Sequence, residues 1–195
     1  MARLTKLDRL YEEMWEAEEF ARYRVDGVNF VPGEGKVPAR ILIVGEAPGA
    51  TENRAGRPFI GASGKVLRQF LTECAEIPEA DCFITNVIHW RPAPDHNRNP
   101  NLLEIEAARP WLRKEWHAVG KPPVIVTAGA SALFAIRPDL HPVSQFVGNP
   151  CALKNGGVLF PMYHPAYPLY NAAMRPKAEE HWTRFGEWYR EEFPR

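Results

Sequence analysis

A short β-branched run at residues 40–44 passes directly into a glycine and proline loop, GEAPG, at residues 45–49. Such a run is typical of a buried strand, and the loop then lies at the carboxyl end of that strand. Open α/β sheets place their ligands at this edge. The loop supplies a carboxylate, Glu46, and an aromatic residue, Phe59, follows shortly after it. We therefore expect the active site here, with a shape suited to a flat polar ring.

Size and composition limit the class of protein. At 195 residues the chain is expected to form one domain, with the helix and linker of residues 1–32 packed on the remainder. The 24 basic and 24 acidic residues cancel, so any affinity for nucleic acid must come from a local patch. Three cysteines without a CxxC pair, and no apolar stretch long enough to cross a bilayer, predict a cytoplasmic protein without membrane contact.

Apolar strand patterns alternate with helical patterns along the chain. Strands are expected at 40–44, 82–88, 124–127 and 158–162, and helices at 4–24, 63–76, 102–118 and 129–136. Ser63 is the expected N-cap of the second helix. Strands separated by helices indicate an α/β fold with a mostly parallel sheet.

Two familiar motifs are incomplete. GASGK at residues 61–65 lacks the first glycine of a P-loop, because Phe59 stands there, and Val66 replaces the final Ser or Thr. What remains is a helix N-terminus that either binds one phosphate or is simply capped. GASA at residues 129–132 lacks the second glycine of a nucleophile elbow, so Ser131 is expected to be an ordinary helix-start residue. The six histidines lack metal-site spacing, and no metal is expected.

Polar side chains end three of the expected strands: Glu46, Asn86 and His164. Because the carboxyl ends of parallel strands meet at one sheet edge, we expect these side chains to converge in one site.

Four motifs in order make a family resemblance specific: GEAPG at 45–49, GRPFIG at 56–61, ITNVI at 84–88 and FPMYHPAY at 160–167. Together they resemble the uracil-DNA glycosylase superfamily, above all its family 4, the iron–sulfur type of bacteria and archaea. The resemblance implies a three-layer αβα sandwich around a central, mostly parallel four-stranded sheet. It also implies an enzyme that flips a uracil nucleotide out of DNA and hydrolyses its N-glycosidic bond, leaving an abasic site.

The resemblance assigns catalytic roles to Glu46, His164 and Glu52. A carboxylate at Glu46 would favour positive charge on the sugar and orient water, and an imidazole N–H at His164 would favour negative charge on the departing uracil. Glu52 is expected to help orient water or to exclude the methyl group of thymine.

The same resemblance places Ala47, Phe59 and Asn86 around the uracil. An amide can donate and accept on the uracil edge, and an aromatic face can stack on the base. Leu169 is the expected wedge that fills the vacated base stack. The other expected DNA contacts are Ser63, Gly64, Lys65, Arg91, His96, Arg98, Pro165 and Tyr167. The implied partner is uracil-containing DNA, single- or double-stranded, bound by a monomer.

One departure from family 4 concerns its four-iron, four-sulfur cluster, which four cysteines hold. The corresponding positions here are Glu18, Ala21, Trp90 and Ala108, and none is a thiolate ligand. We therefore expect no cofactor, and expect Trp90 and the N-terminal aromatic residues to fill that volume.

A second departure is the loop at residues 92–100, which is slightly longer than the family pattern and carries His96. Some members of the superfamily trap the sugar covalently through a loop histidine. This leaves an alternative open, a uracil-DNA binding protein without turnover. Because the chain lacks the GEQPG and KRRIH sequences of those members, His96 is expected to contact phosphate or solvent.

Overall fold

The computed structural model describes residues 4–140, 142–154 and 156–194. The fold is built around one mixed sheet. Its strand order is β1-β3-β2-β4-β6-β5. Strands β3, β2, β4 and β6 are parallel, and the short β1 and β5 add antiparallel edges. The strands are β1 Glu34–Gly35, β2 Ile41–Gly45, β3 Cys82–Asn86, β4 Val124–Ala128, β5 Cys151–Ala152 and β6 Val158–Met162. The expected parallel four-stranded sheet is confirmed, with two edge strands that the sequence did not predict.

Helices cover both faces of the sheet. They are α1 Lys6–Glu16, α2 Ala50–Ala55, α3 Ala62–Gln69, α4 Leu102–Ala118, α5 Ala130–Ile136, α6 Tyr167–Tyr170 and α7 Arg175–Glu192. The expected helix at 4–24 divides into α1 and the 3₁₀ helix Glu18–Tyr23, and the one at 63–76 continues from α3 into a π-helical turn, Phe70–Cys74. The expected cap at Ser63 is wrong, because Gly61 precedes the first turn of α3.

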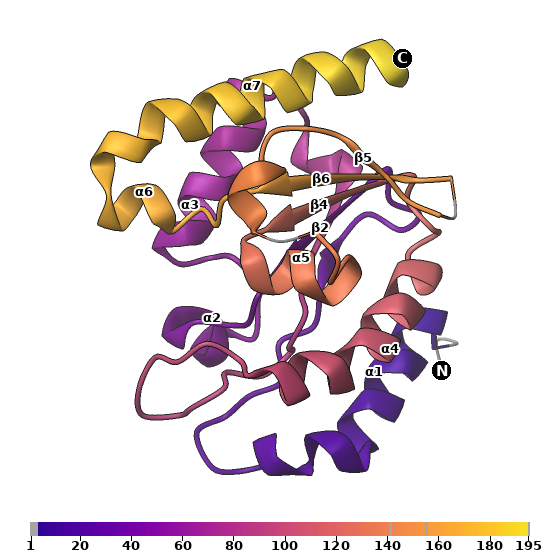
Figure 1. Cartoon of the computed structure of the whole chain (residues 1–195). Helices are drawn as coiled ribbons and strands as arrows, with labels where there is room; N and C mark the ends of the chain where they lie inside the picture. Colours follow the sequence, from indigo (N-terminus) through magenta and orange to yellow (C-terminus); the bar gives the residue numbers. More distant parts are fainter. Residues whose placement is uncertain (1–3, 141, 155, 195) are drawn as a thin grey trace.

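The side chains of each central strand alternate between two separate cores. In β2, Leu42 and Val44 join the core under α4 and α5, and Ile41 and Ile43 join the core under α3 and α7. Figure 1 shows α3 and α7 above the sheet, with α4, α5 and α1 below it. The α/β sandwich of three layers is therefore confirmed. Within the described ranges, no helix is long and apolar enough to cross a membrane.

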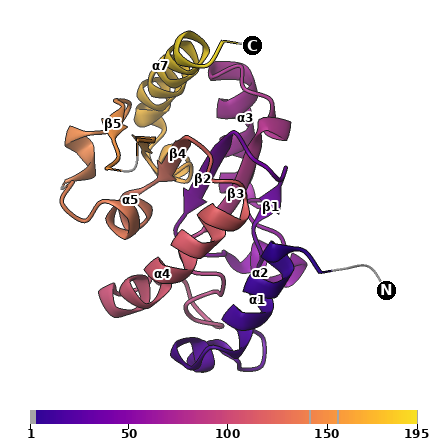
Figure 2. The same ribbon diagram turned by 90° about the vertical axis from the view of Figure 1, so that its right-hand side faces the viewer.

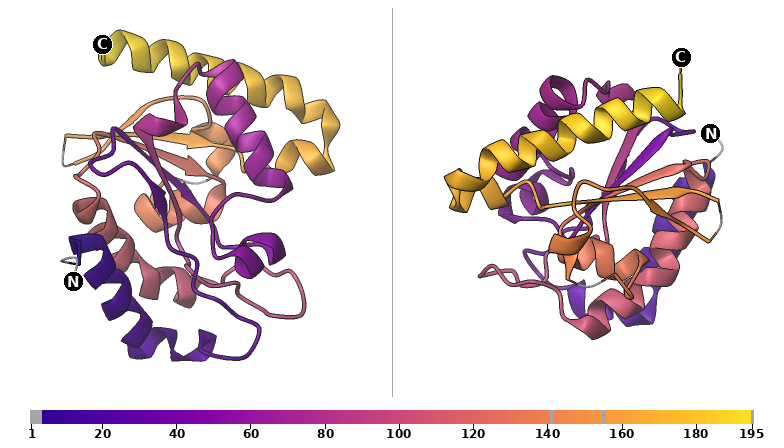
Figure 3. Two further views of the ribbon diagram at one scale, coloured as in Figure 1. Left: turned by 180° about the vertical axis from the view of Figure 1, so that it is seen from behind. Right: turned by 45° about the horizontal axis from the view of Figure 1, so that its top comes forward.

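The N-terminal helices pack along α4, as Figures 2 and 3 show from three sides. Their aromatic side chains surround Trp90, which is fully buried. The Trp90 ring stacks on Tyr23 with centroids 5.6 Å apart and contacts Phe20 at 4.8 Å and Phe30 at 4.9 Å. We call these four residues the aromatic cluster.

The aromatic cluster occupies the place that the family resemblance gives to iron and sulfur. Ala108 is also buried, in the same hydrophobic core as Trp90, Tyr23 and Phe20. No group of three or more potential metal ligands occurs within the residues that the structure describes. The residues present therefore do not fit an iron–sulfur cluster.

A buried carboxylate connects the same N-terminal segment to the sheet. Glu115 of α4 has no exposed surface and accepts hydrogen bonds from Tyr11 at 2.5 Å and from Thr85 of β3 at 3.1 Å. His89 lies 3.6 Å from it. Burial alone would lower the pKa of His89, but the Glu115 carboxylate outweighs burial and raises it. This network fixes α1 and α4 against the strand that carries Asn86.

Replacing Trp90 by alanine should remove the centre of the aromatic cluster and lower the free energy of unfolding by about 3–5 kcal/mol. Urea unfolding followed by circular dichroism measures this loss. Trp90→Phe is the control, because it retains a ring and removes an indole N–H for which the described residues offer no partner. A loss as large for phenylalanine as for alanine would show that ring packing is not the source of the stability.

Candidate functional site

A cavity of about 510 Å³ opens at the carboxyl edge of the parallel sheet. Glu46 follows β2, Asn86 ends β3 and His164 follows β6, and all three line the cavity. Ala47, Glu52 and Phe59 line it as well. The sheet thus brings together every residue that the resemblance implied for catalysis and uracil binding.

Glu46 has a partner that the sequence did not indicate. The hydroxyl of Ser131, in the first turn of α5, donates to Glu46 Oε2 at 2.5 Å. Burial raises the pKa of the Glu46 carboxyl above its usual value, and the Ser131 hydrogen bond opposes that rise. Ser131 therefore stabilises the charged form of Glu46. Ser131 lies at the start of α5, as expected, and its hydroxyl makes this further contact with Glu46.

The hydrogen bonds of His164 define its tautomer. The backbone N–H of Ala166 donates to His164 Nδ1 at 3.1 Å, so Nδ1 carries no proton. Burial lowers the pKa of His164 below its usual value, although the charge of Glu52 opposes this effect. The ring is then neutral with its proton on Nε2, which makes it a hydrogen-bond donor. Gly129, at φ +96°, packs against the His164 side chain, where a Cβ would strain the backbone.

A glycine at the end of β2 lets the side chains of Asn86 and Phe59 approach each other. A Cβ on Gly45 would lie 2.4 Å from both Asn86 Oδ1 and the Phe59 ring. Asn86 is only 3% exposed, yet its side chain borders the cavity. An amide edge and an aromatic face therefore flank one narrow space.

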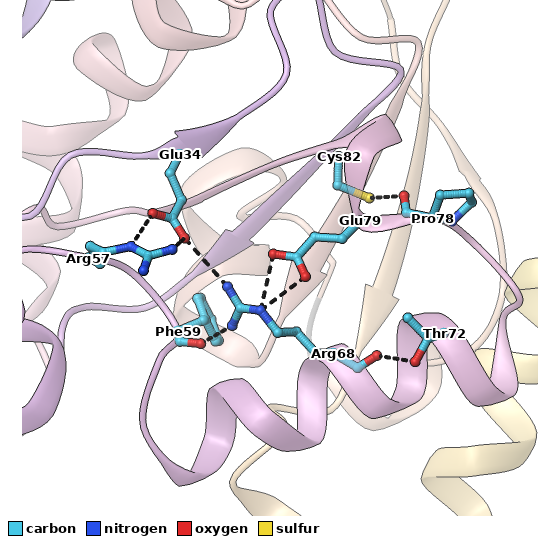
Figure 4. Close-up of polar contacts among 8 residues, drawn as sticks. All are labelled: Glu34, Arg57, Phe59, Arg68, Thr72, Pro78, Glu79 and Cys82. Carbon is cyan, nitrogen blue, oxygen red and sulfur yellow. Dashed lines mark hydrogen bonds and ion pairs between the residues drawn. The ribbon is translucent and has the colours of Figure 1, made fainter.

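The backbone at Phe59 is held in an unusual conformation. Its φ of +51° lies in the left-handed region, which costs free energy for a bulky side chain. The Phe59 carbonyl turns onto α3, where a Cβ on Gly64 would lie 1.7 Å from its oxygen. Arg68 also donates to this carbonyl, as Figure 4 shows. Helix α3 thus determines where the Phe59 ring lies.

Arg68 is itself anchored at two points. Its Nε lies 3.1 Å from both carboxylate oxygens of Glu79, and its Nη2 lies 3.4 Å from Glu34 of β1. Arg57 shares the Glu34 carboxylate, with Nε and Oε2 2.8 Å apart (Figure 4). These contacts connect the Phe59 loop to the edge of the sheet.

Glu52, in α2, is 7% exposed and accepts a hydrogen bond from Gly61 N–H at 2.6 Å. One carboxylate oxygen thereby fixes the start of α3. A phosphate at this helix N-terminus, one of the two alternatives that the sequence left open, would have to compete with the Glu52 carboxylate.

The expected DNA contacts divide into two groups. Ser63, Arg91, His96, Arg98 and Tyr167 line the cavity. Gly64, Lys65, Pro165 and Leu169 do not, although Leu169 is 48% exposed on α6. Gly64 is buried under Phe59, so its clearest role is the close packing of that loop.

Two residues of the loop at 92–100 already have protein partners. Arg98 forms two hydrogen bonds of 2.7 Å with the buried carboxylate of Glu104. This ion pair lowers the pKa of Glu104 to about 2 despite the opposing effect of burial. His96 Nδ1 lies 2.7 Å from the neighbouring Asp95. Arg98 is therefore held by Glu104 as part of the cavity wall. His96 is exposed, and its contact with Asp95 orients its ring.

Sequence reasoning missed a second residue besides Ser131. Tyr170, at the end of α6, is 86% exposed and lines the cavity. A large aromatic side chain exposed beside a cavity favours a stacking contact with a ligand. The only available signal was its place directly after Leu169, the expected wedge.

Taken together, the cavity brings an amide, an aromatic ring, a carboxylate and a neutral imidazole N–H donor into one lining. Such a set binds a planar ring with an amide-like edge and stabilises opposite charges on the two fragments of a breaking bond. Bond cleavage next to a nucleobase is the chemistry that fits.

Comparison with known proteins agrees with this geometry. Residues 32–188 match the model of the uracil DNA glycosylase superfamily. The chain is 34% identical over 191 residues to the type-4 uracil-DNA glycosylase of Sulfurisphaera tokodaii, covering 94% of this chain and 85% of the relative. It is 38% identical over 144 residues to that of Thermotoga maritima, covering 73% of each. A type-5 uracil-DNA glycosylase of Thermus thermophilus is 35% identical over 153 residues, covering 69% of this chain. The chain belongs to the uracil-DNA glycosylase superfamily.

Proposed function

We propose that this protein is a monofunctional uracil-DNA glycosylase of DNA base excision repair, which acts as a single-domain monomer on single- or double-stranded DNA in the cytoplasm and needs no cofactor. The observation that carries the proposal is the meeting of Asn86, Phe59, Glu46 and His164 in one cavity. The names of the relatives, type-4 and type-5 uracil-DNA glycosylases, support the same substrate.

Base recognition follows from the slot beside Gly45. A uracil flipped from the DNA stacks on Phe59, and the Asn86 amide accepts from N3–H and donates to O4. Cytosine presents an acceptor at N3 and a donor at its amino group, so the same amide orientation opposes it. Because residue 45 is glycine, no Cβ stands between the Phe59 ring and the Asn86 amide, where a side chain would clash with both.

Cleavage of the glycosidic bond requires stabilisation of a sugar that becomes positive and a departing uracil that becomes negative. As the bond between C1′ and N1 breaks, its electron pair leaves with uracil, and His164 Nε2–H donates a hydrogen bond to the O2 that becomes negative. The Glu46 carboxylate faces the positive sugar and orients the water that adds at C1′. The proton of that water passes to a base or to solvent, and the products are uracil and an abasic site. Glu52 supports this site by holding Gly61.

A second candidate function rests on His96, whose ring lines the cavity and is oriented by Asp95. In this alternative the histidine adds to C1′ in place of water, and the protein remains bound to the DNA. A covalent adduct between protein and oligonucleotide would survive denaturation in SDS.

Incubation of the protein with a uracil-containing oligonucleotide, followed by alkali and a denaturing gel, should give a cut strand. His164→Ala should lower the cleavage rate by about 10²–10³ with little loss of DNA binding, because the donor acts mainly on charge in the transition state. An uncut strand from the unaltered protein would contradict the proposed function, and an SDS-resistant shifted band would favour the His96 alternative.

Ser131→Ala should move the acidic limb of the kcat/KM profile to higher pH. Loss of a hydrogen bond to a charged group costs about 1.5–3 kcal/mol, so removal of the Ser131 hydroxyl should raise the pKa of Glu46 further. Because activity requires ionised Glu46, the variant loses activity as pH falls before the unaltered protein does. Ser131→Thr keeps a hydroxyl and should restore the profile. An unshifted limb in Ser131→Ala would show that Ser131 does not act through Glu46.

Leu169→Ala should slow excision from duplex DNA more than excision from single strands, because a wedge compensates unstacking only where a base stack exists. The ratio of the two rates, measured on one sequence, gives the effect. Glu46→Gln is the matched control, since it should slow both substrates equally. If Leu169→Ala slowed excision from duplex and single-stranded DNA equally, Leu169 would not be the wedge that enters the base stack.

A further inference from the structure

A second hollow lies on the face of the sheet that α4 and α5 cover. Its volume is about 1170 Å³, and its walls are α4 from Glu106 to His117, the end of α5 and residues 153–154 beside β5. It shares no lining residue with the catalytic cavity. Figure 2 shows α4 and α5 together on this side of the sheet. We call this hollow the α4/α5 groove.

The charge of the α4/α5 groove differs sharply from that of the whole chain. The chain has zero net charge, but the groove is lined by six Lys and Arg side chains and one carboxylate, Glu106. Two of the cations have partners, since Arg137 binds Asp139 at 2.6 Å and Lys114 lies 3.9 Å from Glu13. For the other four, the described residues provide no ion pair within 4 Å, although the charge of Lys154 helps to lower the pKa of Asp139: Arg109, Arg113, Lys121 and Lys154.

These cations crowd one another at a cost to the fold. Arg109 and Arg113 are four residues apart on α4, where like charges repel. Burial and then the charges of Lys121 and Arg113 lower the pKa of His117, which also lines the groove. Packing of the protein itself therefore gives no reason for this concentration of positive charge, and an anionic partner does.

Beneath the cations the groove is apolar. Half-buried Trp116, Ile136 and Leu153 line it and pack on the core. The Trp116 indole donates to the carbonyl of Pro122 at 3.0 Å, which fixes the ring. A partner must therefore offer apolar side chains as well as negative charge.

We propose that the α4/α5 groove docks an acidic segment of another protein, one in which carboxylates flank bulky apolar side chains. Carboxylates would pair with Arg109, Arg113, Lys121 and Lys154, and the apolar side chains would cover Trp116 and its neighbours. This pairing of a cationic rim with an apolar floor distinguishes such a segment from DNA. Single strands bind through exposed aromatic faces, whereas the Trp116 ring is half-buried and packs edge-on with His117 at 4.9 Å.

The test uses fluorescence anisotropy with a fluorescein-labelled peptide of aspartate and glutamate residues flanking two phenylalanines. We expect binding that weakens with added salt and that falls about tenfold or more in the double variant Arg109→Glu/Arg113→Glu. A peptide with serine in place of both phenylalanines should bind much more weakly. The matched control is Lys177→Glu/Arg184→Glu, which makes the same charge change on α7 and should bind the peptide as the unaltered protein does.

Three results would overturn the proposal. One is equal binding of the peptide by the α4 and α7 double variants. Another is loss, in the α4 variant alone, of binding to a uracil-free oligonucleotide, which would make the groove a DNA surface. The third is a dimer in sedimentation that the α4 variant dissociates, which would make a second copy the occupant.

Two further measurements keep the outcome clear. If the α4 variant does not fold, as judged by thermal melting, Lys121→Glu/Lys154→Glu tests the same groove outside the helix. Excision of uracil from a short oligonucleotide should be unchanged in both variants. Absence of excision from the unaltered protein would contradict the proposed glycosylase function, while the peptide experiment would still decide the role of the groove.

Discussion

The pairing of β2 with its two neighbours in the sheet places Glu46, Asn86 and Ser131 at one edge of the sheet. β2 pairs in parallel with β3 on one side and with β4 on the other, in the registers Gly45 to Asn86 and Val44 to Thr127. The three strands therefore end at the same level. Glu46 directly follows β2, and Ser131 follows β4 in the first turn of α5. Both therefore lie at the same edge of the sheet as Asn86, the last residue of β3. A shift of one residue in either register would turn Asn86 or the start of α5 away from the cavity.

The Phe59 loop shows how the cavity is kept narrow. Its ring lies on the bare backbone of Gly45, and its carbonyl lies on the bare backbone of Gly64. The strained φ angle of Phe59 persists because the Arg68 guanidinium donates a hydrogen bond to the Phe59 carbonyl. The carboxylates of Glu79 and Glu34 hold that guanidinium in place. The position of the Phe59 ring thus depends on contacts of α3 and of the sheet edge that lie behind the cavity wall.

The sequence pattern predicted the bounds of an element correctly where contacts between neighbouring residues determine them. The apolar run of β6 predicted its bounds of 158–162, and α4 begins at its expected residue because Asn101 and Glu104 cap each other. The Ser63 cap failed because Gly61 N–H finds a carboxylate nine residues earlier in the chain, Glu52.

Long-range contacts were beyond the reach of such patterns. The hydrogen bond from Ser131 to Glu46 joins residues 85 positions apart, and no local motif announces it. The two-residue strands β1 and β5 exist only because an edge of the sheet accepts them. The α4/α5 groove likewise requires two helices and a hairpin to be placed before its charge can be seen.

The aromatic cluster changes what the cell must supply to make this protein. A metal cluster couples folding to the delivery of the metal and to thiolates that oxidants attack. Trp90, Tyr23, Phe20 and Phe30 replace that requirement by the exclusion of water from carbon surfaces, which every cell provides. The packing around Trp90 can then form without delivery of iron or sulfide.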